Sequence, residues 1–143
     1  MCKAGRTVLF VYAPGLSDGL TLDPARVLEL TGTAFKKPGV TVAQWDGWNA
    51  AYAGSYADVT PQALKQLAAA AGVTLYCDDE VPVFANGQLV AIHMAQGGAK
   101  TITLPVACRE VRELYTGRVV PMQGKRFQYT FATPDTALFE LVP

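Results

Sequence analysis

The spacing of apolar and polar residues changes at Gly72, and this change divides the chain into two regions. Before Gly72, short runs of β-branched and aromatic residues alternate with segments whose apolar residues recur at helical spacing. After it, apolar and polar residues alternate with a period of two, which is typical of strands with one buried face. The pattern predicts an α+β chain with a minimal α/β layer at 1–72 and an antiparallel β domain at 73–143.

The first region begins with a predicted strand and helix. Residues 7–13 form a short apolar run that enters a loop at a Pro-Gly pair, as a buried strand does. Asp23 is suited to cap a helix that begins at Pro24, and Gly32 is suited to end it in the left-handed conformation. The apolar side of this helix would consist of Val27, Leu28 and Leu30.

Two further strands and a second helix complete this region. Residues 40–45 alternate as a strand does, and the aromatic-rich segment 45–56 contains one more strand that ends near Gly54. Thr60 and Pro61 supply the N-cap and the first residue of the second helix. Its apolar residues recur at i, i+3, i+4 and i+7 and are Leu64, Leu67, Ala68 and Ala71.

Turn signals divide the second region into short, evenly spaced strands. Asn86-Gly87 and Thr116-Gly117 are two-residue hairpin signals between alternating runs. Regularly spaced short strands predict a small antiparallel sandwich or barrel. The predicted strands are 73–77, 81–85, 88–95, 101–104, 109–115, 118–120, 127–131 and 137–141.

Composition argues against several classes of partner. Twelve Lys and Arg residues balance twelve Asp and Glu residues, so the sequence lacks the basic surface typical of proteins that bind nucleic acid or anionic membranes. The three cysteines, Cys2, Cys77 and Cys108, have neither CxxC nor close spacing, which argues against a disulfide scaffold or a zinc knuckle. The N-terminal apolar run is too short for a signal peptide or a membrane span. A cytoplasmic protein in a reducing compartment is expected.

The sequence offers few residues for catalysis. His93 is the single histidine, so a Ser-His-Asp, Cys-His or His-based metal site would have to use it. It lies in an alternating strand, where a hydrogen-bonded structural imidazole is the usual outcome. Cys77 precedes three acidic residues, whose negative charge raises a thiol pKa and disfavours the reactive thiolate. This acidic run also lacks the ligand spacing of a calcium loop and is interpreted as a solvated turn.

Motifs that would indicate an enzyme or a nucleotide site are missing from the sequence. It contains no GxGxxG, Walker or GxSxG pattern. A glycosidase needs two carboxyl groups at a fixed separation, and no pair stands out among acidic residues that fall mostly in turns or on outward strand faces. We therefore predict no catalytic residue, no metal site and no cofactor.

A cluster of aromatic residues is the best candidate for a binding site. Sugars stack on exposed aromatic faces, and neighbouring polar side chains can hydrogen-bond their hydroxyl groups. The competing interpretation is that the rings fill the junction between the two regions. The candidate ligand-binding residues are Trp45, Trp48, Tyr52, Asp46 and Asn49, with Tyr56 and Gln44 nearby.

Several phrases of the chain resemble the non-catalytic C-terminal region of bacterial β-galactosidase-like glycoside hydrolases. The first strand and helix of that family's flavodoxin-like, trimerisation-like domain resemble two segments of this chain, TVLFVYAPG and LDPARVLELTG. The last helix of that domain and the small β domain that follows it resemble four further segments, LKQLAAAAGVTLY, ANGQLVAIHMA, KTITLP and VRELYTGRVV. The resemblance implies an accessory or assembly domain, and no catalytic glutamate of the family has a counterpart here.

The segment between Gly32 and Val40 is too short for the remaining β-α units of a full flavodoxin-like domain. Region 1–72 is therefore expected to be a truncated layer whose unpaired sheet edge favours oligomerisation. Expected partners are a second copy or an upstream catalytic domain, with weak carbohydrate contact at the aromatic cluster. The alternatives are a stand-alone ligand-binding or carbohydrate-binding protein that uses Trp45, Trp48 and Tyr52, and a small hydrolase that uses His93 with Cys77 or Asp79.

Overall fold

The computed structural model describes residues 5–143, which divide into two compact units. The N-terminal unit ends at Val73 and the C-terminal unit begins at Thr74. The described residues contain two α-helices and three β-sheets, so the chain is α+β, as its sequence predicts.

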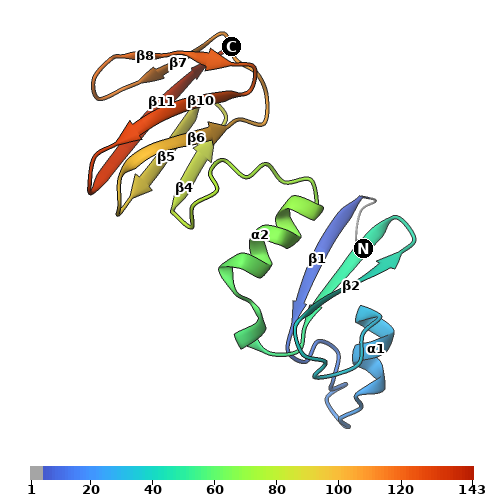
Figure 1. Ribbon diagram of the computed structural model, residues 1–143. Coiled ribbons are helices and arrows are strands. Elements are labelled where there is room, and N and C mark those ends of the chain that lie inside the picture. Colours follow the sequence, from blue (N-terminus) through green and yellow to red (C-terminus); the bar gives the residue numbers. More distant parts are fainter. Residues whose placement is uncertain (1–4) are drawn as a thin grey trace. The chain divides into compact units, whose positions relative to one another are not determined.

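The N-terminal unit is built on a three-stranded mixed sheet (Figure 1). Its strands are β1 (Arg6–Val11), β2 (Val40–Trp45) and β3 (Trp48–Ala53), in the spatial order β1-β3-β2. β3 pairs parallel with β1 and antiparallel with β2. All three strands fall where the hydrophobic pattern predicts them. The carboxyl ends of β1 and β3 therefore lie side by side at one end of the sheet.

The first helix, α1 (Ala25–Thr31), begins one residue later than predicted. Pro24 is its N-cap, and Asp23 still contributes because its carboxylate accepts a 2.9 Å hydrogen bond from the Ala25 amide. Gly32 ends the helix with φ of 70°, and an added Cβ there would meet the Ala43 side chain of β2 at 2.5 Å. A glycine therefore satisfies both the cap geometry and the close approach of α1 to the sheet.

The predicted apolar side of α1 is partly wrong. Val27 is buried, whereas Leu28 and Leu30 are 49% and 40% exposed. The second helix, α2 (Pro61–Ala70), has the predicted cap, because the Thr60 hydroxyl accepts a hydrogen bond from the Ala63 amide. None of its residues is fully buried. Both helices thus leave apolar side chains on the surface of the N-terminal unit.

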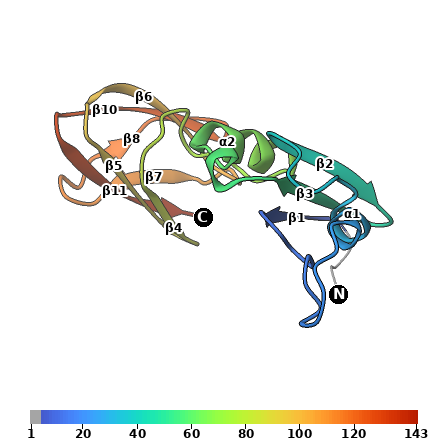
Figure 2. The ribbon, with the colours of Figure 1, turned by 90° about the horizontal axis from the view of Figure 1, so that it is seen from below.

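The C-terminal unit consists of two facing sheets (Figure 2). One has the strand order β6-β10-β9 and the other β4-β5-β11-β7-β8. Neighbouring strands pair antiparallel, and no strand pairing closes the described sheets into a barrel, so the architecture is the predicted sandwich. The strands are β4 (Val83–Asn86), β5 (Leu89–Met94), β6 (Gly98–Thr103), β7 (Glu110–Glu113), β8 (Val119–Val120), β9 (Met122–Gln123), β10 (Arg126–Phe131) and β11 (Asp135–Val142).

The predicted strand at 73–77 is wrong, and the short strand β9 was not predicted. Residues 73–77 run as irregular backbone. The Tyr76 carbonyl accepts one hydrogen bond, from the Thr103 amide, and a single bond does not make a ladder. Residues 73–77 therefore have the alternating sequence of a strand but not the hydrogen-bonded ladder of one.

Alternating residues of both sheets meet in one hydrophobic core. The Phe139 ring lies edge-on to Phe127 and to Tyr129, each at 5.0 Å between ring centroids. These contacts join β11 of one sheet to β10 of the other, as expected for a sandwich. The buried core residues are Cys77, Val90, Ile92, Met94, Ile102, Leu104, Val111, Val120, Phe127, Phe131, Ala137, Phe139 and Leu141.

A buried carboxylate holds the hairpin between β7 and β8. Glu113 is 1% exposed, and its side chain accepts hydrogen bonds from the amides of Tyr115 and Thr116 and from the Thr116 hydroxyl. Burial alone would raise the pKa of Glu113, but these hydrogen bonds outweigh it and hold the pKa below its ordinary value. Glu113 is thus an exception to the prediction that the acidic residues lie mostly in turns or on outward strand faces, and it stabilises the turn that contains Thr116.

Candidate functional site

The two tryptophans of the predicted aromatic cluster form a pair on one face of the sheet. Trp45 and Trp48 are register partners across the β2–β3 hairpin, and their rings stack at 6.1 Å with an angle of 11° between them. Trp45 is 40% exposed, and Trp48 is half-buried with its ring edge-on to Phe10. The pair therefore presents part of an aromatic surface to solvent.

The other predicted ligand-binding residues do not gather around this pair. Asp46 lies in the exposed hairpin turn beside it. Asn49 follows Trp48 in β3, so its side chain points to the opposite face, where its amide donates a 3.5 Å hydrogen bond to the Thr7 hydroxyl. Tyr52 is wholly buried. The structure therefore brings together two of the predicted residues, with Asp46 next to them, and separates Asn49 and Tyr52 from them.

Tyr52 instead connects two loops of the N-terminal unit. Its hydroxyl donates a 2.7 Å hydrogen bond to the Tyr12 carbonyl and accepts a 3.1 Å hydrogen bond from the Lys36 amide. Tyr12 follows β1 directly, and Lys36 lies in the loop before β2. The buried phenol thus fixes the backbone of both loops at the same end of the sheet.

A cavity of about 480 Å³ opens at this end of the sheet, and we call it the Tyr cleft. Its volume is within the range of roughly 300–1,000 Å³ found for small-molecule sites. It lies where β1 and β3 end, and ligands of open α/β sheets bind beyond the carboxyl ends of parallel strands. The cleft is lined by Tyr12, Lys36, Pro38, Gly54, Ser55, Tyr56 and Asp58.

The backbone of the Tyr cleft adopts unusual conformations. Tyr12 has φ of 66° and Lys36 has φ of 59°, and these are the non-glycine residues with positive φ in the described part of the chain. The left-handed conformation is unfavourable by about 1–2 kcal/mol for such residues. Conformations of this kind persist where surrounding contacts enforce them, and they concentrate at ligand sites. The contact that joins both residues here is the Tyr52 hydroxyl.

Aromatic rings form one side of the Tyr cleft. Tyr12 and Tyr56 stack at 6.3 Å between centroids with an angle of 25°, and Phe35 lies edge-on to Tyr12 at 6.1 Å. Tyr12 is 45% exposed and Tyr56 is 75% exposed. The ammonium group of Lys36 lies 5.4 Å from the centre of the Phe35 ring. A cation and two accessible aromatic faces are therefore available to a ligand.

The loop after β3 supplies the remaining polar groups and is well ordered by its own hydrogen bonds. It leads into a short 3₁₀ helix, Tyr56–Asp58. The Ser55 hydroxyl accepts from the Ala57 amide, and the Asp58 carboxylate accepts from the Ser55 amide, which together form a capping box. Tyr56 is thus held on a defined turn despite its exposure.

Gly54 fixes the distance between the two sides of the Tyr cleft. It is buried, and an added Cβ would clash with the Lys37 carbonyl oxygen. The loop that carries Lys36 can therefore lie directly against the end of β3 only because position 54 has no side chain. This explains in physical terms why a glycine follows the alanine-rich β3.

His93 and Cys77 lie in the C-terminal unit, and each has its own hydrogen-bond partner. His93 is exposed, and its Nδ1 lies 2.8 Å from the Thr136 hydroxyl on β11. Cys77 is buried and donates a hydrogen bond to Asp79. Burial is the main cause that raises the pKa of its thiol; a hydrogen bond with the Asp79 backbone opposes it, and the Asp79 carboxylate adds to it. Burial also raises the pKa of the Cys108 thiol. In the described residues, Cys77 and Cys108 are free, and no cluster of His, Cys, Asp and Glu could hold a metal ion. Cys2 lies outside these residues.

Sequence reasoning named Tyr56 but missed its partner Tyr12. The two residues are far apart in the chain, and they meet because β1 and β3 pair in parallel. The available signal was their position, since Tyr12 lies at the end of the predicted strand 7–13 and Tyr56 lies just after the strand predicted to end near Gly54. Parallel pairing of those strands would have placed both at one edge.

Searches of protein-family models, of curated proteins and of solved structures found no match to this chain. In residues 5–143, no helix has the length and apolar character needed to cross a membrane.

Proposed function

We propose that the chain is a non-catalytic assembly domain, and that it associates with a second copy of itself through β1. The observation that carries this proposal is the position of β1. Its core sequence, VLFV, is apolar on both faces, which is typical of a central parallel strand covered on both sides. Yet β1 is the outer strand of its sheet, and none of its residues is fully buried.

The outer edge of β1 has backbone groups available for pairing. The Tyr12 amide bonds to the Ala53 carbonyl of β3, so by strand alternation the amides of residues 6, 8 and 10 also point toward β3. The amides of Thr7, Leu9 and Val11 then point away from the sheet. Two-fold pairing of β1 with its copy would use these groups and form one continuous six-stranded sheet.

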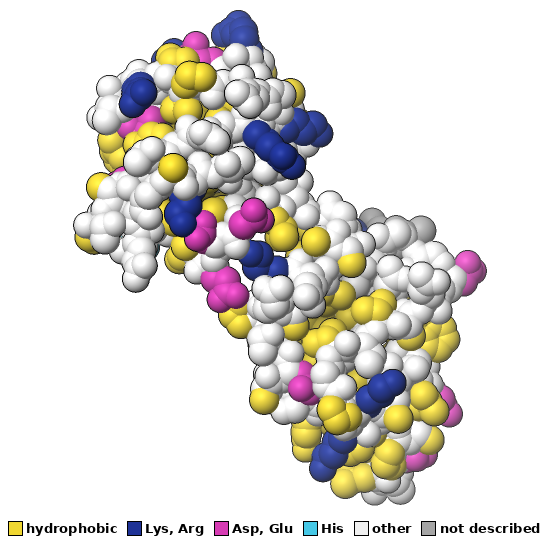
Figure 3. Space-filling view, in the orientation of Figure 1, with side chains coloured by type: hydrophobic (Ala, Val, Ile, Leu, Met, Phe, Trp, Pro, Cys, Tyr) yellow, Lys and Arg dark blue, Asp and Glu magenta, His cyan; other side chains and the backbone are white. Residues whose placement is uncertain are grey.

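Figure 3 shows hydrophobic side chains on the surface of the N-terminal unit, and such exposed groups also support the proposal. Leu20 and Leu22 are 93% and 73% exposed. They do not lie on a loose loop, because the Asp18 carboxylate accepts hydrogen bonds from the amides of Leu20 and Thr21 and pairs with Arg26 at 2.6 Å. Exposed leucines on an ordered loop are typical of contact surfaces. The sequence resemblance to glycoside hydrolase C-terminal regions also favours an accessory role.

The test is sedimentation velocity across a range of protein concentrations, with Thr7→Pro as the variant. Proline at position 7 removes an outward amide and leaves the bonds between β1 and β3 in place. We expect a reversible dimer for the wild-type chain, and a loss of dimer for Thr7→Pro with unchanged circular dichroism. Thr7→Ala keeps the amide and should dimerise like wild type. A wild-type chain that stays monomeric at every concentration would contradict the proposal.

A second candidate function is a stand-alone carbohydrate-binding protein, which the stacked and partly exposed pair of Trp45 and Trp48 favours. Here the rings would contact a sugar from the sheet face, with Asp46 at the edge of the pair. Titration of tryptophan fluorescence with galactosides and arabinosides tests this alternative. A saturable response that Trp45→Ala abolishes would support it, and a flat titration would exclude it.

A further inference from the structure

We infer that the Tyr cleft is a binding site for a neutral pyranose sugar. This site is distinct from the tryptophan pair and does not depend on assembly through β1. The cleft lies beyond the carboxyl ends of the parallel strands β1 and β3, where α/β sheets bind their ligands.

The walls of the cleft are held in shape before any ligand arrives. The Tyr52 hydroxyl joins the left-handed residues Tyr12 and Lys36, and Gly54 allows the Lys36 loop to lie against β3. The capping box of Ser55 and Asp58 orders the turn that carries Tyr56. A preformed cavity reduces the ordering that binding would otherwise require.

The chemistry of the lining selects the ligand class. Tyr12 and Tyr56 offer aromatic faces that the C–H groups of a sugar ring can cover. Lys36 can donate to hydroxyl groups, Asp58 can accept from them, and Ser55 can do either. The two charged groups have opposite signs, so the cleft does not select an anion or a cation. A ring with one apolar face and hydroxyl groups of both hydrogen-bonding roles matches this set.

A flat aromatic ligand fits less well. The tyrosine rings already contact one another at 6.3 Å, which leaves no space between them for a third ring. Such a ligand could cover the outside of one ring but would form fewer hydrogen bonds with Lys36, Asp58 and Ser55 than a sugar with several hydroxyl groups. The polar groups of the cleft thus favour the sugar.

The test uses the whole chain and the methyl pyranosides of galactose, glucose, mannose and xylose, with benzoate as the flat aromatic probe. Saturation-transfer NMR detects binding at millimolar ligand, and titration of amide shifts gives the dissociation constant and its location. We expect one or more pyranosides to bind, with the largest shifts at Gly54, Ser55 and Lys36. Tyr56→Ala should raise the dissociation constant about tenfold, and Tyr56→Phe, which keeps the ring, should restore binding.

Two variants make the result specific. Tyr115→Ala removes a tyrosine of similar exposure, 70%, from the C-terminal unit and should leave binding unchanged. Trp45→Ala should also leave it unchanged. Binding that Trp45→Ala abolishes and Tyr56→Ala does not would overturn the Tyr cleft and favour the tryptophan pair. No binding by any pyranoside, or binding of benzoate alone, would overturn the sugar assignment while leaving assembly through β1 to its own test.

Discussion

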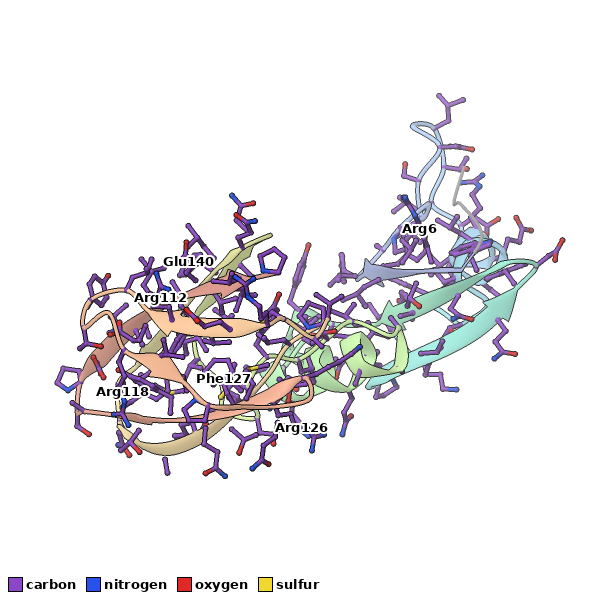
Figure 4. All side chains as sticks on the ribbon, turned by 90° about the horizontal axis from the view of Figure 1, so that it is seen from above. Arg6, Arg112, Arg118, Arg126, Phe127 and Glu140 are labelled. Carbon is purple, nitrogen blue, oxygen red and sulfur yellow. The ribbon has the colours of Figure 1, made fainter. Side chains whose placement is uncertain are left out.

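The two units bury side chains of different size. In the C-terminal unit, Phe127, Phe131 and Phe139 are buried between two sheets, and Figure 4 shows Phe127 within this sandwich. In the N-terminal unit, the buried part of the sheet is mostly alanine, and its one large buried ring, Tyr52, is hydrogen-bonded to two loops.

Both units also carry exposed large apolar side chains. Those of the C-terminal unit are Phe84, Leu89, Val106, Leu114, Tyr115 and Val119. Large apolar residues on the surface of the N-terminal unit are Tyr12, Leu20, Leu22, Leu28, Leu30, Val42, Trp45, Tyr56, Leu64 and Val73. Burial of apolar area is the main source of folding stability. The C-terminal unit buries more large apolar side chains, so we expect it to be the more stable of the two units. The C-terminal unit therefore has the larger apolar core, and the proposed contact surfaces lie on the N-terminal unit.

The largest expected effect is that of Phe139→Ala on the C-terminal unit. Phe139 is fully buried and contacts three aromatic rings, so its loss should lower the free energy of unfolding by about 3–5 kcal/mol. Both tryptophans lie in the N-terminal unit. In denaturant titrations, the far-ultraviolet circular dichroism transition should therefore shift, while the tryptophan fluorescence transition stays in place.

Phe84→Ala is the matched control, because Phe84 is 71% exposed in the same unit and its loss should change stability by less than about 0.5 kcal/mol. If Phe139→Ala shifts both transitions equally, the two units unfold together and the comparison fails.

Glu113→Gln sharpens the comparison within the C-terminal unit. The buried carboxylate accepts three hydrogen bonds that an amide cannot reproduce, so the loss should be about 1–3 kcal/mol at neutral pH. Because the pKa of Glu113 is lower in the folded state, its stabilisation is present above the ordinary carboxyl pKa and is lost as pH falls through the folded pKa. The difference between variant and wild type should therefore shrink in acid.

Chemical unfolding at a series of pH values measures this difference. Glu140→Gln is the control, since Glu140 is a partly exposed strand residue 3.9 Å from Arg112 and should show little change at any pH. A Glu113→Gln difference that is constant with pH would mean that the carboxylate charge does not act as described.

Tyr52→Phe has the smallest expected effect on stability and tests the N-terminal unit. Removing the hydroxyl leaves the Tyr12 carbonyl and the Lys36 amide without their partner, at a cost of about 1–2 kcal/mol. The tryptophan fluorescence transition should move, and the Lys36 amide should exchange faster with solvent. Tyr56→Phe removes an exposed hydroxyl and should do neither. An unchanged Lys36 exchange rate in Tyr52→Phe would contradict the bridging role.

Local signals in the sequence predicted much of the fold. Thr60 and Pro61 begin α2 as expected, and Gly32 ends α1. A hairpin turn joins β4 to β5 as predicted, but it lies one residue later, at Gly87 and Gln88, because Asn86 pairs with Leu89. These features depend on neighbouring residues, which a sequence displays directly. The alternation of Ala137, Phe139 and Leu141 likewise predicted the buried face of β11.

Features that depend on residues far apart in the chain were not predictable in this way. Tyr52 was interpreted as a ligand-binding ring, but it is buried, with its hydroxyl bonded to a carbonyl 40 residues away. The Tyr cleft depends on the parallel pairing of β1 with β3, which no local pattern encodes. Leu28 and Leu30 were predicted to share the apolar side of α1 with Val27, but residues two apart do not share a helix face, and only Val27 of the three is buried.

The central claim, that the N-terminal unit associates through β1, is tested most directly by hydrogen exchange at several protein concentrations. The amides of Thr7, Leu9 and Val11 point away from β3, so the account predicts fast exchange at low concentration and increasing protection as concentration rises. Amides of β11, which has strand partners on both sides, should be protected at every concentration. Exchange of the three β1 amides that does not change with concentration would contradict the claim.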